Sequence, residues 1–439
     1  MHYETDGDSG RIKSTRKLLR LVVSIMRYLP ISYHKPLLPN GLHPPIDWQL
    51  YGFFCSNGWP LAAHITKTRY IADIMVTIMQ FMSESMVLIG EAVVMHDNLD
   101  NISFVCTVLA PNLILFEMML RAYNIIYRRN SFRTHIEEFY KKIYIQRTWN
   151  PELFEKIRRQ QLPTKYSTFT YIITLVTYVY VPVSGLIKNE RLVPFPINFG
   201  FDYTVPWPRY LVFLTMSMWT GFAVVGPLVA EANILAMQIL HLNGRYSLLL
   251  EDLRNISRES IVEHEKCKRK DNMLVTQRFR YRLYDIIRRN VELNDFAKSM
   301  QEQYSFRVFV MLALSATLLC VLGFLTATLG ITAQNIRFVS WIIGKIVELL
   351  IFGRLGTTLS TTTDKLSTSY YCCDWEDVIL QSTNAEENKK LMKLIALAIH
   401  LNSNPFRLTG LNFSVVNYET VVAILRGAGS YFTVIYAYR

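Results

Sequence analysis

The chain has 439 residues, of which 51% are hydrophobic and 13% aromatic, and its formal net charge is +12. Soluble domains are roughly 45 to 50% apolar even when glycine is counted, so this composition excludes an ordinary soluble protein and predicts a membrane protein. The six cysteines are scattered and form neither a disulfide framework nor a zinc-binding spacing.

The N-terminal region begins with a basic amphipathic segment. Residues 11–28 combine Lys and Arg with an apolar face, which is typical of a helix lying on an anionic membrane surface. Two arginines interrupt its apolar run and no small-residue cleavage site follows, which excludes a signal peptide. Prolines and the stretch 58–60 (Gly-Trp-Pro) then prevent a continuous helix. We expect residues 1–70 to form a cytosolic or interfacial region.

Seven later segments are long enough to span a membrane, for which ~20 mostly apolar residues are needed. The third, fourth and fifth are the strongest, because each contains a long stretch without any charged residue. The predicted spans are residues 71–94, 101–127, 167–188, 209–233, 307–331, 338–358 and 416–437.

The distribution of Lys and Arg predicts the orientation. These residues gather before the first span and in the loops 128–166, 234–306 and 359–415, and are sparse elsewhere. The positive-inside bias therefore places the N-terminus in the cytosol, and an odd number of spans places the C-terminus outside. A G-protein-coupled receptor has the opposite orientation, and its Asp-Arg-Tyr and Asn-Pro-x-x-Tyr motifs do not occur.

We thus expect an all-α membrane protein with seven transmembrane helices and cytosolic helical extensions that form an anchor. The basic run 266–270 is interpreted as a solvated loop near anionic lipid, so no nucleic-acid partner is expected. The regions are 1–70 before the bundle, 71–233 with spans one to four, 234–306 as a cytosolic helical loop, 307–358 with spans five and six, 359–415 as a cytosolic anchor segment, and 416–439 as the last span.

Several predicted spans contain charged residues. Glu117 has a partner at helical spacing in Arg121, and Lys345 has one in Glu348. Glu84 and Arg426 have none nearby in the sequence. An ionisable residue inside a membrane is a candidate for function, and a packing pair or a side chain that reaches the interface is an equally good interpretation here.

The longest outer loop, 189–208, is rich in aromatic residues and proline. Such a segment is typical either of a lid over an apolar pocket or of an interfacial belt, and the sequence leaves both open. No motif for hydrolysis, redox chemistry or nucleotide binding occurs, and no enzyme, cofactor or metal is expected. A channel, a transporter or a receptor remains, and the internal repeats typical of a transporter are not visible.

The last span is almost uncharged and contains small residues in its middle, which let helices approach closely in a membrane. Gly427, Tyr431, Val434 and Tyr438 follow one another at spacings of four, three and four, and so share one face. An aromatic and small stripe of this kind on a terminal helix predicts the inner wall of an oligomer.

The C-terminal block resembles the insect odorant receptor family. The family pattern of a tyrosine followed four residues later by a tryptophan is present as Tyr371 and Trp375, and its Ser-Tyr-Phe-Thr signature is present at residues 430–433. The Gln-Phe ending of the related gustatory receptors is absent. The loop before the fifth span is shorter than in the family's co-receptor, so the resemblance is to a ligand-tuned subunit.

The resemblance implies a function. Ligand-tuned subunits of the family assemble with the odorant co-receptor as a four-subunit cation channel in the plasma membrane of sensory dendrites. The last spans line the pore and the cytosolic helices form the main subunit contact. The family's pore constriction corresponds here to Val434 and Tyr438, where Tyr438 departs from the usual aliphatic residue. A gustatory-type or metabotropic receptor and a secondary transporter remain the alternatives.

The family resemblance also implies a pocket for a small volatile ligand in the outer half of the bundle. In the predicted topology, the outer ends of five spans supply apolar and aromatic side chains that suit such a ligand. The expected lining residues are Phe104, Thr107, Val108, Tyr178, Val181, Phe213, Met216, Trp219, Thr326, Trp341 and Ile342.

Overall fold

The computed structural model describes residues 67–267, 274–329 and 336–437. Helices dominate these ranges, and the one sheet in them is a two-stranded hairpin. The predicted helix at 11–28, the stretch 58–60, most of the basic run 266–270 and Tyr438 lie outside the described residues.

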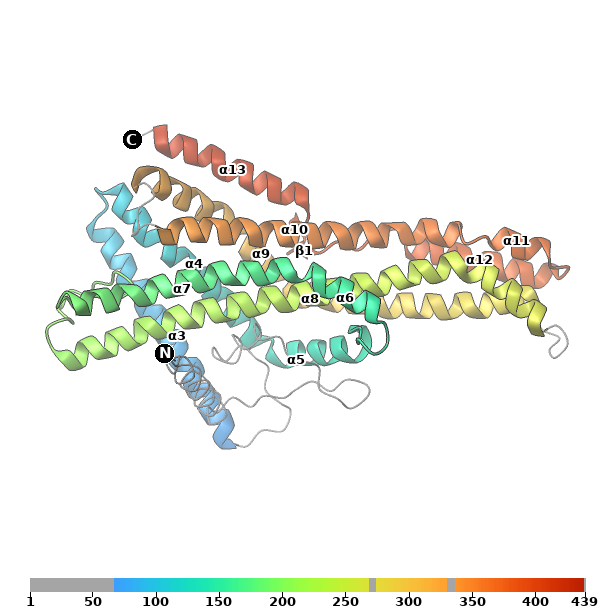
Figure 1. Ribbon diagram of the computed structural model, residues 1–439, viewed down its shortest axis with the longest axis horizontal. Helices are drawn as coiled ribbons and strands as arrows, with labels where there is room; N and C mark the ends of the chain where they lie inside the picture. The colour runs from blue at the N-terminus through green and yellow to red at the C-terminus, as the bar shows by residue number, and fades with distance from the viewer. Residues whose placement is uncertain (1–66, 268–273, 330–335, 438–439) are drawn as a thin grey trace, which may run out of the picture.

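The molecule is elongated, and three very long helices run along its long axis (Figure 1). Helix α8 covers Trp207–Cys267, α9 covers Val275–Leu329 and α10 covers Ile336–Tyr371. The 61 residues of α8 correspond to about 90 Å of helix, three times the ~30 Å of a bilayer core. The predicted fourth, fifth and sixth spans are therefore segments of helices that continue well beyond them.

The shorter helices complete two connected bundles. Helices α3 (Lys67–Asp97), α4 (Ile102–Tyr127) and α7 (Leu162–Ile187) pack beside one end of α8 to α10. The other elements are α5 (Arg129–Glu138), η2 (Phe139–Ile143), α6 (Pro151–Gln160), α11 (Trp375–Leu380), α12 (Ala385–Leu401), β1 (Thr409–Gly410), β2 (Ser414–Val415) and α13 (Tyr418–Ala437). Helices α11 and α12 lie at the far end from α3 and α13 (Figure 1).

Local sequence explains several of these boundaries. The side chain of Asn101 accepts a hydrogen bond from the backbone of Phe104 at the start of α4, and Asn150 caps α6 in the same way, with Pro151 in its first turn. At the end of α10, the indole of Trp375 donates a hydrogen bond of 3.1 Å to the carbonyl of Tyr371. The tyrosine and tryptophan of the predicted family pattern thus close a helix terminus, where carbonyl groups need a donor.

The hydrophobic core has two regions, each in one of the two bundles. The distal bundle is formed by α5, η2, α6, α11, α12 and the parts of α8, α9 and α10 that pack on them, and its core is continuous. The cavity bundle is formed by α3, α4, α7 and the opposite parts of α8, α9 and α10, with a second core around Leu115, Tyr178 and Trp341.

Five helices of the described residues are long and apolar enough to cross a membrane by length and composition: α3, α4, α7, α8 and α9. Helices α10 and α13 cover the predicted sixth and seventh spans. The positions of all seven predicted spans therefore coincide with long helices in the described part of the chain.

Candidate functional site

An apolar cavity lies between α4, α7, α8 and α10. Its unfilled space amounts to ≈ 470 Å³, including the part that opens to the outside. The lining residues are Pro111, Ile114, Leu115, Tyr171, Thr174, Leu175, Tyr178, Phe195, Gly221, Val224, Val225, Leu228 and Trp341. Its lining is of the apolar kind that the sequence predicts for an odorant pocket, and we call it the odorant cavity as a name only.

Aromatic rings form one wall of the odorant cavity. The ring of Tyr178 stacks on that of Trp341 with 5.8 Å between centroids, and lies 5.1 Å from the ring of Phe195. Gly221 of α8 also lines the cavity and leaves room: a Cβ atom there would meet Leu175 only at 3.8 Å, which is ordinary contact. Rigid rings and a missing side chain thus both shape the cavity.

The segment between α7 and α8 covers the cavity. Phe195 lines the cavity itself, and Phe199 and Tyr203 pack against Phe213 with centroid distances of 5.5 and 4.9 Å. The backbone amide of Asn198 donates a hydrogen bond to Gly90 on α3. Of the two interpretations left open by the sequence, this packing favours a lid, because Phe195, Phe199 and Tyr203 pack onto the cavity or α8, although Phe201 is 49% exposed.

A network of six buried charges lies beside the cavity. Arg121 pairs with Glu117 at 2.9 Å and with Glu231 at 2.7 Å, and Glu231 pairs with Arg307 at 3.0 Å. Each of these side chains is at most 3% exposed. The two pairs predicted from helical spacing are therefore part of a larger network in which four helices participate.

The network continues to α10 and α7. Lys345 lies 3.1 Å from Glu117 and 3.2 Å from Glu348, and the hydroxyl of Tyr171 donates a hydrogen bond of 2.9 Å to Glu348. Three carboxylates balance three cations, so the buried network is neutral. Because removing one member would leave another charge buried and unpaired, the network fixes how these helices meet.

Comparison with known proteins decides the family. Residues 101–429 match the family described as 7tm Odorant receptor. Odorant receptor 74a of Drosophila melanogaster is 35% identical over 410 residues, which cover 92% of this chain and 98% of that receptor. This chain belongs to the insect odorant receptor family.

Further comparisons agree. Odorant receptor 35a of Drosophila melanogaster is 33% identical over 333 residues, which cover 76% of this chain and 79% of that receptor. The structure of the olfactory receptor OR5 from Machilis hrabei in complex with eugenol superposes with a TM-score of 0.70 at 13% identity, covering 96% of this chain and 99% of that one. The odorant receptor fold, with seven transmembrane helices, is thereby confirmed, and the chain is a multi-pass membrane protein.

The lining predicted for an odorant receptor pocket is only partly found at the cavity. Tyr178 and Trp341 line it. Phe213 lies under the lid, Val108 is fully buried without lining the cavity, and Phe104 is 37% exposed. The half-buried residues that lie elsewhere on the outer parts of the helices are Thr107, Val181, Met216, Trp219, Thr326 and Ile342.

The cavity lies deeper in the bundle than the predicted lining. On α7 the lining residues 171, 174, 175 and 178 follow the spacing of one helix face, and on α8 residues 221, 224, 225 and 228 repeat it. On α4 residues 111, 114 and 115 do the same. These stripes are readable in the sequence, and following them inward would have found the cavity.

Glu84 and Arg426, for which the sequence offers no charged partner at helical spacing, lie in different surroundings. Glu84 receives a neutral partner in place of a charged one, because Gln80, one turn earlier, donates a hydrogen bond of 3.0 Å to its carboxylate. Arg426 is exposed on α13, and no ion pair to it occurs among the described residues. Within the same residues, no group of three or more His, Cys, Asp or Glu is arranged to hold a metal ion.

The predicted stripe on the last helix faces away from its own bundle. A Cβ atom at Gly427 would meet nothing within 4 Å, and Tyr431 and Val434 are 67% and 50% exposed. The opposite face packs on α9 and α10 through Val421 and Ala428, which are 1% and 6% exposed. The stripe is thus free of intrachain contacts as far as Val434.

The start of α13 is held firmly. At Gly356 of α10 a Cβ atom would overlap the carbonyl of Val416, so only glycine permits this approach. Gln301 of α9 exchanges hydrogen bonds with the backbone of Thr409 in the hairpin that precedes α13. If α13 moves, its N-terminal end therefore stays in place and the rest of the helix moves relative to that end.

Proposed function

We propose that this chain is the odorant-binding subunit of a non-selective cation channel, which it forms with an odorant co-receptor. The observation that carries the proposal is an apolar, lidded cavity in a member of the odorant receptor family. Membership in that family makes the chain a receptor subunit, and we assign it no catalytic role.

The odorant cavity suits small volatile ligands with a large apolar part. A ligand that buries about 300 Å² of apolar surface gains roughly 7 kcal/mol at ~25 cal/mol per Å², before the cost of lost translational freedom. This gross gain falls short of the roughly 8 kcal/mol of micromolar binding even before that cost, so the apolar contact gives weak binding and not nanomolar affinity. The Machilis hrabei receptor with the same fold was solved in complex with eugenol, which supports the same ligand class.

Helix α10 is the element that would transmit binding to the pore. It carries Trp341 at the cavity, Lys345 and Glu348 in the charge network, and Gly353 and Gly356 at the base of α13. These positions span about 22 Å of one helix. An odorant that fits the cavity better when α10 has shifted therefore favours a different position of α13, provided that its affinity differs between the two states.

The pore is assigned to the stripe of α13, with Val434 and Tyr438 as its constriction. Hydrophobic constrictions gate by dewetting, so a tilt of this helix is enough to open or close the path. The exposed Tyr431 and Val434 support an inner wall completed by other subunits, because a lone chain leaves them uncovered.

The test is odorant-evoked current in cells that express this chain with the co-receptor. We expect current within milliseconds in excised patches without GTP. Current that disappears when G-protein cycling is blocked would favour a metabotropic receptor instead. Substrate accumulation by this chain without the co-receptor would favour a transporter. A Val434→Ala variant that leaves ion permeation unchanged would contradict the pore assignment.

A further inference from the structure

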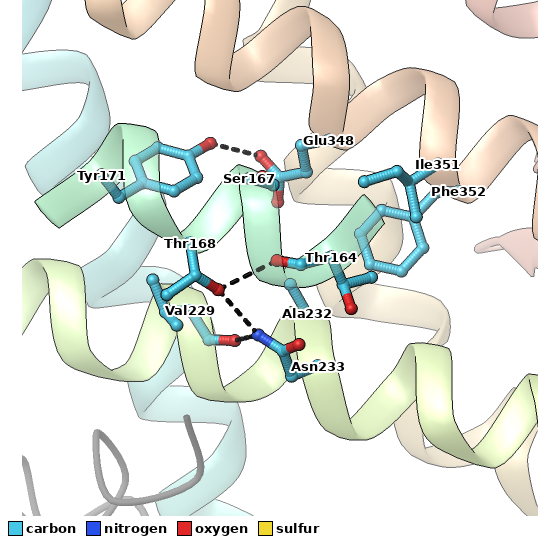
Figure 2. A pocket seen from close by; sticks show the side chains of 10 residues that line it. All are labelled: Thr164, Ser167, Thr168, Tyr171, Val229, Ala232, Asn233, Glu348, Ile351 and Phe352. Atoms are coloured by element: carbon cyan, nitrogen blue, oxygen red, sulfur yellow. Dashed lines mark hydrogen bonds between the residues drawn. The ribbon is translucent and has the colours of Figure 1, made fainter. Parts of the chain in front are cut away.

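A second, polar pocket lies between α7, α8 and α10, next to the odorant cavity. Its unfilled space is ≈ 260 Å³, including the part that opens to the outside. Figure 2 shows Glu348 and Ser167 at one end of it and Asn233 at the other, with Thr164 and Thr168 between them. Tyr171 lines both this pocket and the odorant cavity. Six of the ten residues that line the pocket therefore carry polar side chains, and the pocket borders the odorant cavity.

Two buried oxygens at this pocket accept no hydrogen bond from the described residues. Glu348 is 2% exposed. Its Oε2 accepts a hydrogen bond from the hydroxyl of Tyr171 and pairs with Lys345, while its Oε1 accepts no hydrogen bond within the described chain. Asn233 is 2% exposed, and its Oδ1 likewise accepts no hydrogen bond within the described chain. A buried acceptor without a donor is unfavourable, so such atoms point to a guest.

The orientation of the Asn233 amide is determined by its neighbours. Its Nδ2 donates 2.8 Å to the carbonyl of Val229 and 3.1 Å to the hydroxyl of Thr168. A carbonyl can only accept, so exchanging nitrogen and oxygen would place two acceptors together. The Oδ1 atom is therefore the one that remains without a donor.

The hydroxyl groups around the pocket are already committed as donors. Thr164 donates to the carbonyl of Gln161, Thr168 donates to that of Thr164, and Tyr171 donates to Glu348. The hydroxyl of Ser167, a residue that is 7% exposed, is the one at the pocket that donates no hydrogen bond within the described chain. The pocket thus offers two acceptors and one hydroxyl that can give or receive.

We propose that this pocket binds an O–H group, which donates to Glu348 Oε1 or Asn233 Oδ1 and accepts from Ser167. The guest is neutral, because the adjacent network already balances three carboxylates with three cations, and an added cation would disturb that balance. Water and the hydroxyl of an odorant have this chemistry, and both are small enough to enter.

The two sources differ in what they predict. A bound water molecule would serve every ligand alike. An odorant hydroxyl would make the receptor prefer an alcohol over an ether of equal size, and this alternative rests on the proposed function. It requires the ligand to place its apolar part in the odorant cavity and its hydroxyl past Tyr171, which borders both spaces.

The first experiment is a high-resolution map of the purified receptor complex in lipid nanodiscs, without odorant. Density within hydrogen-bonding distance of Glu348 Oε1 or Asn233 Oδ1 identifies a water molecule. In the same map of an Asn233→Leu variant, any density beside residue 233 should be absent. This experiment does not depend on channel activity. It can therefore contradict the proposed pocket without contradicting the proposed channel function, and the reverse.

The second experiment compares a straight-chain primary alcohol with the methyl ether of equal heavy-atom count. If the odorant hydroxyl binds, Asn233→Leu or Ser167→Ala should reduce the alcohol preference roughly ten-fold, as expected for one lost hydrogen bond. If water binds, both ligands should shift by the same factor. Asn243→Leu, the same substitution on α8 outside the pocket, is the matched control and should leave the ratio unchanged.

The proposal is overturned by one combination. The wild-type map would show ordered waters elsewhere in the bundle and none in this pocket, and the alcohol-to-ether ratio would be the same in the wild type, Asn233→Leu and Ser167→Ala. Density in the pocket supports bound water, and a change in the ratio supports a bound odorant hydroxyl.

Discussion

The two bundles of this receptor are built on different principles. In the distal bundle, aromatic rings fill the core: Phe139 is fully buried, with ring centroids 5.0 Å from Tyr140 and 5.7 Å from His241. In the cavity bundle, the space between rings is left open and six buried charges hold the helices together. A rigid base and an adaptable outer part suit a receptor that must change shape on binding.

The two bundles should therefore respond to substitution in different ways. Close packing in the distal bundle makes each lost side chain costly, since the surroundings relax only partly. In the cavity bundle, lost charges should be costly and lost apolar volume should be tolerated. The predictions below test this contrast from the largest expected effect to the smallest.

The largest effect is expected from Glu117→Leu. This change removes the partner of both Arg121 and Lys345 and leaves two buried positive charges with less compensation. A broken buried pair costs about 3 to 5 kcal/mol, so little folded receptor should reach the cell surface. Surface labelling and thermal unfolding in detergent measure this. Glu138→Gln breaks an exposed pair with Lys142 and should cost less than about 1 kcal/mol.

The comparison of Phe139→Ala with Tyr178→Ala tests packing directly. Phe139 is surrounded by the distal core, so its truncation should cost about 3 to 5 kcal/mol. Tyr178 already borders open space, so its truncation should cost clearly less while it changes which odorants activate the receptor. Equal losses of thermal stability in the two variants would show that the cavity is not an adaptable space.

Acidity should weaken the distal bundle through His135. This side chain is 1% exposed and stacks on Phe296, and burial, with a contribution from the charge of Arg307, lowers its pKa to about 4. The unfolded chain, with a pKa near the ordinary 6.5, binds more protons between these values, so stability is complete at neutral pH and falls as the pH drops from about 6.5 toward 4.

At pH 5 the loss from His135 alone should be roughly 2 kcal/mol. A His135→Gln variant should be less stable at neutral pH and show a flatter pH dependence, and unfolding temperatures measured from pH 7 to 5 test this. His96, whose side chain is 83% exposed, provides the control, and His96→Gln should keep the wild-type slope. An unchanged slope in His135→Gln would assign the acid sensitivity to other groups.

Much of the architecture could be predicted because it depends on local pattern. The spans follow from apolar length, the α4 pair from the four-residue spacing of Glu117 and Arg121, and the α10 pair from the three-residue spacing of Lys345 and Glu348. The contact between Lys345 and Glu117 joins residues far apart in the chain, and it depends on how α10 packs against α4. Helical spacing carries no information about such packing.

An apolar pocket in the bundle was expected from the sequence, and that it holds an odorant stays a prediction. The expected lining residues lie near the outer ends of the spans, and Tyr178 and Trp341 are the two of them that line the cavity. Gly221 was missed because it contributes to the cavity by lacking a side chain, and a hydropathy pattern detects only the side chains that are present. Its place on the stripe shared with Val224, Val225 and Leu228 was the available signal.

Gly221→Leu should give the smallest change in stability and a selective change in function. A Cβ atom at this position has ordinary contact with Leu175, so the larger side chain can extend into the odorant cavity without displacing backbone. We expect folding and surface expression near those of the wild type, with odorant sensitivity reduced about ten-fold or more, most strongly for the largest ligands. Dose–response curves for a homologous ligand series measure this.

The control for Gly221→Leu is Thr215→Leu, which adds similar apolar bulk to an exposed position on the same helix. It should leave the dose–response curves unchanged. If the two variants behave alike, the space beside Gly221 is not where the odorant binds. If Gly221→Leu reduces sensitivity to large ligands and spares the smallest, the free volume of the cavity bundle sets ligand size, while the close-packed distal bundle sets stability.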